Sequence, residues 1–522
     1  MPRHISSIDA YAAEAIYMPT SLLIERAGHA LASCVKGAVG EGSAVLILVG
    51  NGHNGADGYA AGRFLLEEGY RVTIVDLMGR GQRSEAAKRV ADTYVSLPDA
   101  VLYTYSPDKR AEKHVDTEGL NRLLEQADLV IDAVFGTGFK GELPISVQNV
   151  LYTLSNMKKR PYLLAADLPM GVFADTGEVH PLAVPFDQTL MLSFPKLGLY
   201  SYPARRFCGR LSLDTLGLPI EKITEHFGFD DRVIDQTDIK EFLPPREQEG
   251  HKGSYGTLGM LCGSDAYPGA ALLAASSALH MGVGLVRAFG NEEMRSLMLT
   301  ATPEVVFTKT PSLSSWSEEY ARHFFEEHSK VSAWLVGCGA GVSDGLASCL
   351  RVLLTTEGAP IVLDADALNT IAIPTYGLRP LLGECPRQTV LTPHPLEFAR
   401  LFGHETTAVN QKRLTLAKKY ASKYKLTILL KGAGSVIAMK TGAVYINTSG
   451  NSSLSKGGSG DVLAGAIASF AAMGMPLEKA TAVAMYLHGR AGEKLSEKYS
   501  EYGVLPSELP KMMAKEILVC QK

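Results

Sequence analysis

The stretch KGGSGDVLAGAIASFAAMG, residues 456–474, decides the fold of the second half of the chain. It opens with small residues, places Asp461 at their end, and continues as an apolar segment of helical length. Small residues at the start of a helix leave backbone N–H groups free to bind an anion. An aspartate beside them is placed to take a proton from a hydroxyl group that attacks phosphate. A glycine-rich turn in which Asp461 only caps the helix would show the same local pattern.

Three other loops in this half have a similar character, and each follows a short apolar run. Residues 337–341 read GCGAG, residues 431–435 read KGAGS, and His394 lies just before a helix that Pro395 would begin. A lone histidine at a helix start is more often a cap or a surface residue, so His394 is a candidate site residue only together with the other loops. Because ligands bind at the carboxyl ends of parallel strands, we expect these loops to form one nucleotide site. The chain has no G-x-x-x-x-G-K-[ST] loop, which excludes a Walker-type ATPase.

Short apolar runs alternate with helical stretches along the whole chain, which is typical of parallel strands buried on both faces. Helices are expected over residues 7–17 and from residue 20 towards 39. A charged segment between Leu216 and Gly250 reads as a connector, so we predict two consecutive α/β domains. The predicted strands are residues 44–49, 71–76, 128–134 and 162–167 in the first half and 257–261, 333–336, 361–363, 389–391 and 427–430 in the second.

The composition is that of a soluble globular protein. Apolar residues make up 46% of the 522 residues and charged residues 20%, and the formal net charge is −4. This balance gives no general reason to bind nucleic acid or an anionic membrane. The seven cysteines form no C-x-x-C pair, and the N-terminus has no apolar signal core. We therefore expect a cytoplasmic protein with reduced thiols that acts on small molecules.

A second glycine loop, GNGHNG at residues 50–55, matches G-x-G-x-x-G, and Asp76 follows at the spacing of a dinucleotide-binding fingerprint. That match favours a dehydrogenase. However, a negative Asp57 beside a pyrophosphate is unfavourable, whereas asparagine and aspartate oxygens suit a cation or sugar hydroxyls. Two later strands also lead into acids, Asp132 and Asp167. Each acid alone could simply cap a turn, but the three loops together favour a binding site.

The segments GNGHNGADG, DAVFGTGFKGE, DLPMGVFADTG and SFPKLGL resemble the NAD(P)H-hydrate epimerase family. The resemblance covers residues 1–217. It implies a Rossmann-like three-layer α/β/α domain that interconverts the R and S forms of hydrated NAD(P)H and binds a potassium ion.

The same resemblance implies residue roles. Asp167 would contact the substrate and is the candidate acid or base, with Lys196 in a secondary role. Potassium would be held by Asn54, Asp132 and position 170. This chain departs from the family at Ala56, where glycine is usual, and at Met170, where serine is usual, so only a backbone carbonyl of Met170 suits potassium. The other substrate contacts would be His53, Asn54, Gly55, Ala56, Asp57, Gly136, Thr137, Gly138, Phe139, Lys140, Gly141 and Glu142.

Residues 225–522 resemble the ADP-dependent NAD(P)H-hydrate dehydratases, which have a ribokinase-like fold. The matching segments, in order, include VGCGAG, LDADALN, LTPHPLEFARL, LLKGAGSVIA and SKGGSGDVLAGAIASF. The resemblance implies that Asp461 is the base and that Mg²⁺ assists, with Asp364 and Asp366 as weak candidate ligands. Contacts to the hydrated nucleotide would come from Ala270, Gly339, His394 and Asp461. Contacts to ADP would come from Lys431, Gly432, Ala433, Gly434, Ser435 and Gly460.

The sequence thus predicts a bifunctional repair enzyme for hydrated NADH and NADPH, acting as a homo-oligomer. Three alternatives remain open. One is a small-molecule kinase of the ribokinase class with a non-catalytic Rossmann-like module at its N-terminus. A second is the two-domain dehydrogenase that the G-x-G-x-x-G match favours. In the third, the N-terminal half only binds another protein or a degraded cofactor.

Overall fold

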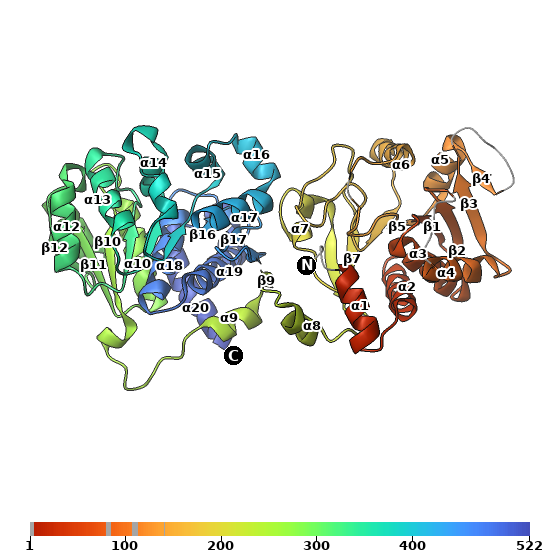
Figure 1. Cartoon of the computed structure of the whole chain (residues 1–522), viewed down its shortest axis with the longest axis horizontal. Coiled ribbons are helices and arrows are strands. Elements are labelled where there is room, and N and C mark those ends of the chain that lie inside the picture. Colours follow the sequence, from red (N-terminus) through yellow and green to blue (C-terminus); the bar gives the residue numbers. More distant parts are fainter. Residues whose placement is uncertain (1–4, 80–84, 107–112, 140, 522) are drawn as a thin grey trace. The chain divides into compact units, whose positions relative to one another are not determined.

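The computed structural model describes residues 5–79, 85–106, 113–139 and 141–521. The chain divides into two compact units, Met1–Asp230 and Asp231–Lys522 (Figure 1). Within the described ranges, no helix combines the length and the apolar composition that crossing a bilayer requires.

The first unit is built on an eight-stranded sheet in the order β4-β3-β2-β1-β5-β6-β7-β8, as far as the structure describes it. Every neighbouring pair of these strands is parallel. The strands are β1 (Ala44–Val49), β2 (Arg71–Asp76), β3 (Val101–Tyr105), β4 (His114–Val115), β5 (Leu129–Ala133), β6 (Tyr162–Ala166), β7 (Gln188–Leu192) and β8 (Arg210–Asp214).

Helices cover both faces of this sheet, and β1 shows why its sequence is continuously apolar. Val45, Ile47 and Val49 belong to a core that includes residues of α1 to α4 and α8. Leu46 and Leu48, which point the other way, belong to a core with α5 and α6. The predicted three-layer α/β/α architecture is therefore confirmed. The helices are α1 (Ile5–Ala15), α2 (Thr20–Lys36), α3 (His53–Glu67), α4 (Glu85–Val95), α5 (Thr117–Gln126), α6 (Ile145–Asn156), α7 (Leu197–Tyr200) and α8 (Ile220–Phe227).

The second unit contains a ten-stranded sheet in the order β12-β11-β10-β13-β14-β15-β16-β17-β18-β9, counted over its described residues. All neighbours are parallel except that β17 runs antiparallel to both β16 and β18. The strands are β9 (Arg232–Ile234), β10 (Thr257–Leu261), β11 (Leu285–Gly290), β12 (Val306–Lys309), β13 (Ala333–Val336), β14 (Ile361–Leu363), β15 (Thr389–Leu391), β16 (Thr427–Leu430), β17 (Val436–Ala438) and β18 (Val444–Asn447).

Small residues let two helices of this unit approach each other closely. α10 and α18 share one core with the sheet, and Gly465 of α18 lies against the backbone of Ala274 in α10. On the opposite face, Phe324 and Phe325 of α12 pack on Trp334 of β13. The helices are α9 (Gln236–Phe242), α10 (Pro268–Met281), α11 (Glu292–Ala301), α12 (Glu318–Glu327), α13 (Asp344–Thr355), α14 (Asp366–Ala372), α15 (Pro395–Phe402), α16 (Thr406–Gln411), α17 (Arg413–Tyr424), α18 (Ser459–Ala472), α19 (Leu477–Gly503) and α20 (Leu509–Gln521).

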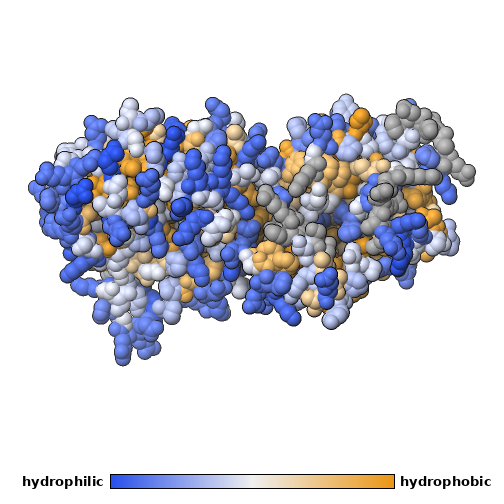
Figure 2. Space-filling model, viewed as in Figure 1, coloured by the Kyte–Doolittle hydropathy of each residue, from blue (hydrophilic) through white to orange (hydrophobic). Residues whose placement is uncertain are grey.

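The predicted strands are all present, but the charged segment between the two halves is more ordered than a connector. Its first part forms α8, whose Ile223 is fully buried in the first unit's core. Its second part contributes β9, which pairs with β18 at the edge of the second sheet. The division falls after Asp230 because α8 packs in the core of the first unit whereas β9 belongs to the sheet of the second. Over the second unit, Figure 2 shows mostly hydrophilic side chains on the visible face, as expected when the apolar residues lie inside.

The close approach of α10 and α18 yields a stability prediction. A Cβ atom at position 465 would lie 2.2 Å from the carbonyl oxygen of Ala274, so Gly465→Ala must push the two helices apart. We expect a loss of about 1–3 kcal/mol in the free energy of unfolding, although alanine favours helix. The measurement is the midpoint of thermal denaturation. Gly269→Ala, in the same helix pair but with no atom within 4 Å of the added methyl, is the control and should not lower it. Equal midpoints for the two variants would contradict the proposed packing.

Candidate active sites

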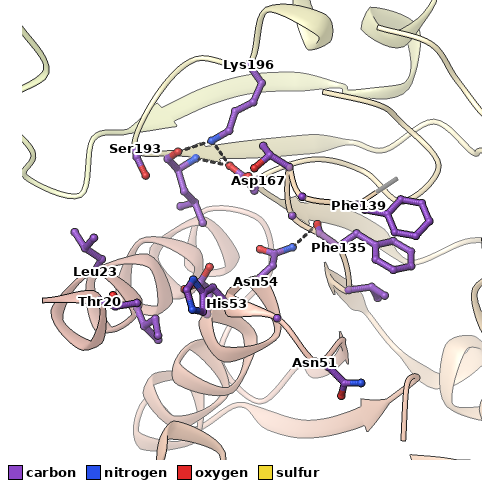
Figure 3. Close-up of a pocket in the computed structure, with 18 of the residues that line it drawn as sticks. Thr20, Leu23, Asn51, His53, Asn54, Phe135, Phe139, Asp167, Ser193 and Lys196 are labelled. Atoms are coloured by element: carbon purple, nitrogen blue, oxygen red, sulfur yellow. Dashed lines mark hydrogen bonds and ion pairs between the residues drawn. The ribbon is translucent and has the colours of Figure 1, made fainter. Parts of the chain in front are cut away.

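A cavity of about 970 Å³ opens in the first unit, at the carboxyl ends of its central strands (Figure 3). The start of α3 contributes His53, Asn54 and Asp57, and the loop after β5 contributes residues 134–139. The segments after β6 and β7, together with α1 and α2, complete the wall. This is the position at which parallel sheets bind ligands, and three predicted loops meet there.

Asn54 presents an unused polar atom in this cavity. Its Nδ2 donates hydrogen bonds to the carbonyl oxygens of Phe135 (2.7 Å) and Ala166 (3.0 Å). Its Oδ1 is buried and has no hydrogen-bond partner among the residues that the structure describes. Because an unsatisfied buried oxygen costs free energy, this atom is suited to receive a ligand such as a cation.

Asp132 is fully buried beneath the cavity rather than in its lining. Its carboxylate accepts hydrogen bonds from the backbone N–H groups of Val134 (3.1 Å) and Met170 (2.6 Å). Burial raises its pKa to about 7 despite these two donors. The Met170 side chain packs in the apolar core, so this residue reaches the site region through its backbone alone.

An ion pair faces the same cavity (Figure 3). Lys196 binds the Asp167 carboxylate and also donates to the carbonyl of Leu192. The backbone N–H of Leu192 donates to Asp167 at 3.1 Å. Asp167 has a φ of +70°, a conformation that non-glycine residues rarely adopt. The surrounding structure therefore holds this carboxylate in one defined position at the cavity wall.

The structure distributes the predicted substrate contacts unequally. Gly55 packs on the backbone of Gly50, since an added Cβ would lie 2.0 Å from the Gly50 oxygen. Ala56 is buried with Ile24 and Ala60, so its methyl group lies in the core and not among the cavity-lining residues. Predicted residues that line the cavity are His53, Asn54, Asp57, Gly136, Thr137, Gly138, Phe139 and Asp167. Gly141 and Glu142 are exposed outside the lining, and Lys140 lies outside the described residues.

In the second unit, a buried carboxylate joins several strand-end loops. Asp364 Oδ1 accepts hydrogen bonds from Lys431 Nζ and Thr392 Oγ1, both at 2.7 Å. Its Oδ2 lies 3.9 Å from Cys338 Sγ. Ligand atoms of Cys338, Asp364 and Asp461 all lie within 4.8 Å of one another. The loops after β13, β14, β15 and β16 thus converge on the start of α18, as predicted.

The charges of this cluster set its protonation. Burial and the nearby Asp364 charge together raise the pKa of Asp461 to about 6. Burial lowers the pKa of Lys431, but the Asp364 and Glu397 charges outweigh it, and the net direction is upward. Near neutral pH, Asp461 is therefore mostly ionised yet basic for an aspartate, as a general base requires.

His394 caps α15. Its Nδ1 accepts hydrogen bonds from the backbone N–H groups of Leu396 (3.2 Å) and Glu397 (3.3 Å). The carboxylate of Glu397 in turn accepts a hydrogen bond from the backbone N–H of His394 at 2.8 Å. Burial and the Lys431 charge lower the pKa of His394. Because Nδ1 is an acceptor, the neutral ring carries its proton on Nε2. The capping role that the sequence left open is thus present, beside the charged cluster.

Gly339, Gly432 and Gly460 each lie against another residue of the predicted contact set. A Cβ at Gly460 would lie 3.5 Å from Lys431 Nζ, and one at Gly339 would lie 2.7 Å from the Ala270 methyl group. Ser435 Oγ closes the 431–435 loop by bonding both the N–H (3.1 Å) and the carbonyl (2.7 Å) of Gly432. A side chain at Gly339 would therefore collide with Ala270, so this glycine is needed for the close packing of the loop.

Some residues of this site lacked a recognisable sequence signal. Thr392 and Glu397 sit inside the quoted TPHPLE segment, but their contacts to Asp364 and to the His394 backbone depend on the fold. Arg413 lies outside every motif, and it is buried behind Gly432. His488 is also buried, with its Nε2 3.1 Å from Ser459 Oγ at the start of α18. It belongs to the segment YLHGRAG, residues 486–492, which also resembles the dehydratases, but its contact with Ser459 depends on the fold.

Comparisons with known proteins agree over both units. Residues 258–515 match the family model described as NAD(P)H-hydrate dehydratase, and residues 20–198 match the one described as YjeF-related protein N-terminus. A solved structure of an ADP/ATP-dependent NAD(P)H-hydrate dehydratase from Bacillus subtilis is 29% identical, with a TM-score of 0.49, and covers 56% of this chain and 99% of its own.

Two curated relatives carry the same name, bifunctional NAD(P)H-hydrate repair enzyme. The protein from Moorella thermoacetica is 33% identical and aligns with 97% of this chain and 94% of its own length. The protein from Vibrio cholerae is 32% identical and aligns with 93% and 91%, respectively. The chain therefore belongs to the family of bifunctional NAD(P)H-hydrate repair enzymes.

Proposed function

We propose that this chain restores hydrated nicotinamide cofactors in two steps. The first unit interconverts the R and S forms of hydrated NAD(P)H. The second unit dehydrates the S form with ADP and releases NAD(P)H, AMP and phosphate. The observation that carries the second step is the basic Asp461 carboxylate beside the buried Asp364–Lys431 pair at the start of α18.

In the dehydratase step, Asp461 accepts the proton of the ring hydroxyl, and the freed oxygen attacks the terminal phosphoryl group of ADP. The backbone N–H groups at the start of α18, around residues 458–460, stabilise the charge that develops on the phosphoryl oxygens. AMP departs as the leaving group. The lone pair of the ring nitrogen then expels phosphate from the neighbouring carbon, and loss of a proton from the next carbon restores the reduced ring.

The donor set of the second unit also suits Mg²⁺. Asp364 Oδ1 is occupied by Lys431 and Thr392, which leaves Oδ2 as a hard oxygen ligand. The Asp364 carboxylate would hold the ion, whereas the Cys338 thiol is a poor ligand for it. Bound Mg²⁺ would neutralise charge on the ADP phosphates.

In the epimerase step, Asp167 is the candidate group that moves a proton at the substrate, and Lys196 holds it in place. We further propose a potassium site at Asn54 and Asp132. The unpartnered Asn54 Oδ1 supports it, as does the burial of the Asp132 carboxylate without a cationic side chain among the causes of its shifted pKa. A cation there would lower the pKa of Asp132 and would give Asn54 Oδ1 a partner.

The dehydratase is tested with an R/S mixture of hydrated NADH and ADP, by following the absorbance of reduced nicotinamide. We expect Asp461→Asn to abolish recovery, because the amide cannot take the proton, while Asp344→Asn, an exposed position on α13, leaves the rate unchanged.

The wild-type rate of recovery should fall as the pH drops below about 6, where Asp461 becomes protonated. Recovery by Asp461→Asn at the wild-type rate would rule out the base. A stable phosphorylated product would instead favour the kinase alternative.

The epimerase is tested in the same mixture. Asp167→Asn should recover the S fraction at the normal rate, because the second unit is intact, and recover the R fraction no faster than it epimerises spontaneously. The dehydratase thus serves as an internal control, and Asp99→Asn, an exposed position on the same unit, controls for the loss of one charge. Full and fast recovery by Asp167→Asn would contradict the assignment.

The potassium site is tested without catalysis. At equal ionic strength, K⁺ should raise the thermal midpoint of the wild-type chain above that in tetramethylammonium, because a ligand that binds only the folded state stabilises it. Asn54→Ala should lose this difference. A K⁺ effect of the same size in Asn54→Ala would exclude Asn54 as a ligand.

A further inference from the structure

A buried guanidinium lies directly behind the loop proposed to hold ADP. Arg413, the first residue of α17, is only 4% exposed. Its Nη2 donates to the carbonyl oxygens of Leu430 and Lys431, both at 3.0 Å. A Cβ at Gly432 would lie 3.0 Å from Nη2 and 3.1 Å from Nη1. The backbone at the start of the 431–435 loop therefore rests on this guanidinium.

The positive charge of Arg413 has no acidic partner in the part of the chain that the structure describes. No carboxylate there forms an ion pair with it, and its buried Nε has no hydrogen-bond partner among the described residues. Burial alone lowers its pKa to about 10, which leaves it charged at neutral pH. Its place at the positive end of the α17 dipole adds to the cost. Burying an unpaired cation is expensive, so an anion that arrives nearby is favoured.

Lys431 does not supply this charge, although it is the cation that the loop's sequence displays. Its ammonium group is already bound to Asp364 at 2.7 Å. The positive charge behind the proposed nucleotide loop that lacks an acidic partner among the described residues is therefore that of Arg413. A diphosphate lying on the outer side of the loop would be its counter-ion, acting through one layer of backbone.

Arg387 provides a comparison, because it too is buried and has no acidic partner among the described ion pairs. Its Nε donates to Thr356 O (2.7 Å), its Nη1 to Ala359 O (3.2 Å) and its Nη2 to Thr356 Oγ1 (3.0 Å). It precedes β15, at the end of the strands opposite the cluster. Each guanidinium nitrogen of Arg387 thus has a hydrogen-bond partner within the protein. Arg413, by contrast, has an Nε without a partner among the described residues, and it lies behind the proposed nucleotide loop.

We infer that Arg413 is a positioning residue for the adenine nucleotide: it anchors the first carbonyls of the 431–435 loop and supplies the uncompensated charge that attracts the nucleotide's phosphates. The inference rests on the proposed function in that it takes this loop as the nucleotide site. Arg413, which lies outside every recognisable motif, would thus favour binding of a charged nucleotide over an uncharged nucleoside.

The test is calorimetric binding of ADP, AMP and adenosine to the full chain. Arg413→Gln should weaken ADP binding roughly tenfold or more, AMP binding less, and adenosine binding not at all, since the effect follows ligand charge. Arg413→Lys, which keeps a cation but loses the paired carbonyl bonds, should lie between. In the dehydratase assay the KM for ADP should rise with little change in kcat. Arg387→Gln, the matched control, should lower the thermal midpoint without altering the ratio of ADP to adenosine affinity.

Equal losses for ADP and adenosine in Arg413→Gln would show a merely structural role and overturn the inference, as would unchanged ADP affinity. A wild-type chain that binds ADP with these ratios but does not dehydrate hydrated NADH would support the inference and overturn the proposed function. A wild-type chain that binds none of the three ligands would overturn both.

Discussion

The second unit depends on one buried carboxylate, that of Asp364. Removing an aspartate and a lysine from water costs several kcal/mol per ion, and the Asp364–Lys431 pair offsets this only because Thr392 also bonds to the carboxylate. These bonds fix the loops after β14, β15 and β16 relative to one another. Burial raises the pKa of Asp461, and the Asp364 charge adds to this shift. The residue that joins the loops thus also contributes to the basicity of the proposed catalytic group.

The first unit also buries carboxylates, but their ion-pair and hydrogen-bond partners differ from those in the second unit. Asp167 is paired with Lys196, while among the described residues Asp132 accepts hydrogen bonds from two backbone N–H groups and burial raises its pKa to about 7. Asn54, which lines the same cavity, has a buried Oδ1 with no hydrogen-bond partner in that part of the chain. Both units place acids after parallel strands, where the sheet exposes backbone ends and leaves space for ligands. In the first unit the lysine is paired with Asp167, the proposed catalytic acid, whereas in the second it is paired with Asp364 and not with the proposed base Asp461.

The sequence predicted several interior strands, such as 44–49 and 333–336, because strands buried on both faces are usually continuously apolar. It did not predict β3, β4, β7, β8, β9, β11, β12, β17 or β18. β7 begins with the polar pair Gln188 and Thr189, and β9 is only three residues long and begins with Arg232. Loops rich in glycine predicted which strand ends converge on the candidate sites. The partner of each charged group could not be predicted, because Lys431 and Asp364 are joined by strand order and not by spacing. Arg413 carries no motif, since its function would arise only from what is packed in front of it.

The G-x-G-x-x-G loop shows how a correct spacing can serve another physical purpose. A Cβ at Gly50 would lie 2.1 Å from the carbonyl oxygen of Val134, and one at Gly55 would lie 2.0 Å from that of Gly50. Both glycines are therefore needed for backbone to pack on backbone, which a tight strand-to-helix turn demands whatever it binds. The helix start that would face a pyrophosphate instead carries Asn54 and Asp57 towards the cavity. The glycines determine the turn, whereas the polar side chains of the loop and the helix start face the cavity, which is why we propose a cation and a hydrated nicotinamide ring as its ligands and not the diphosphate of a dehydrogenase cofactor.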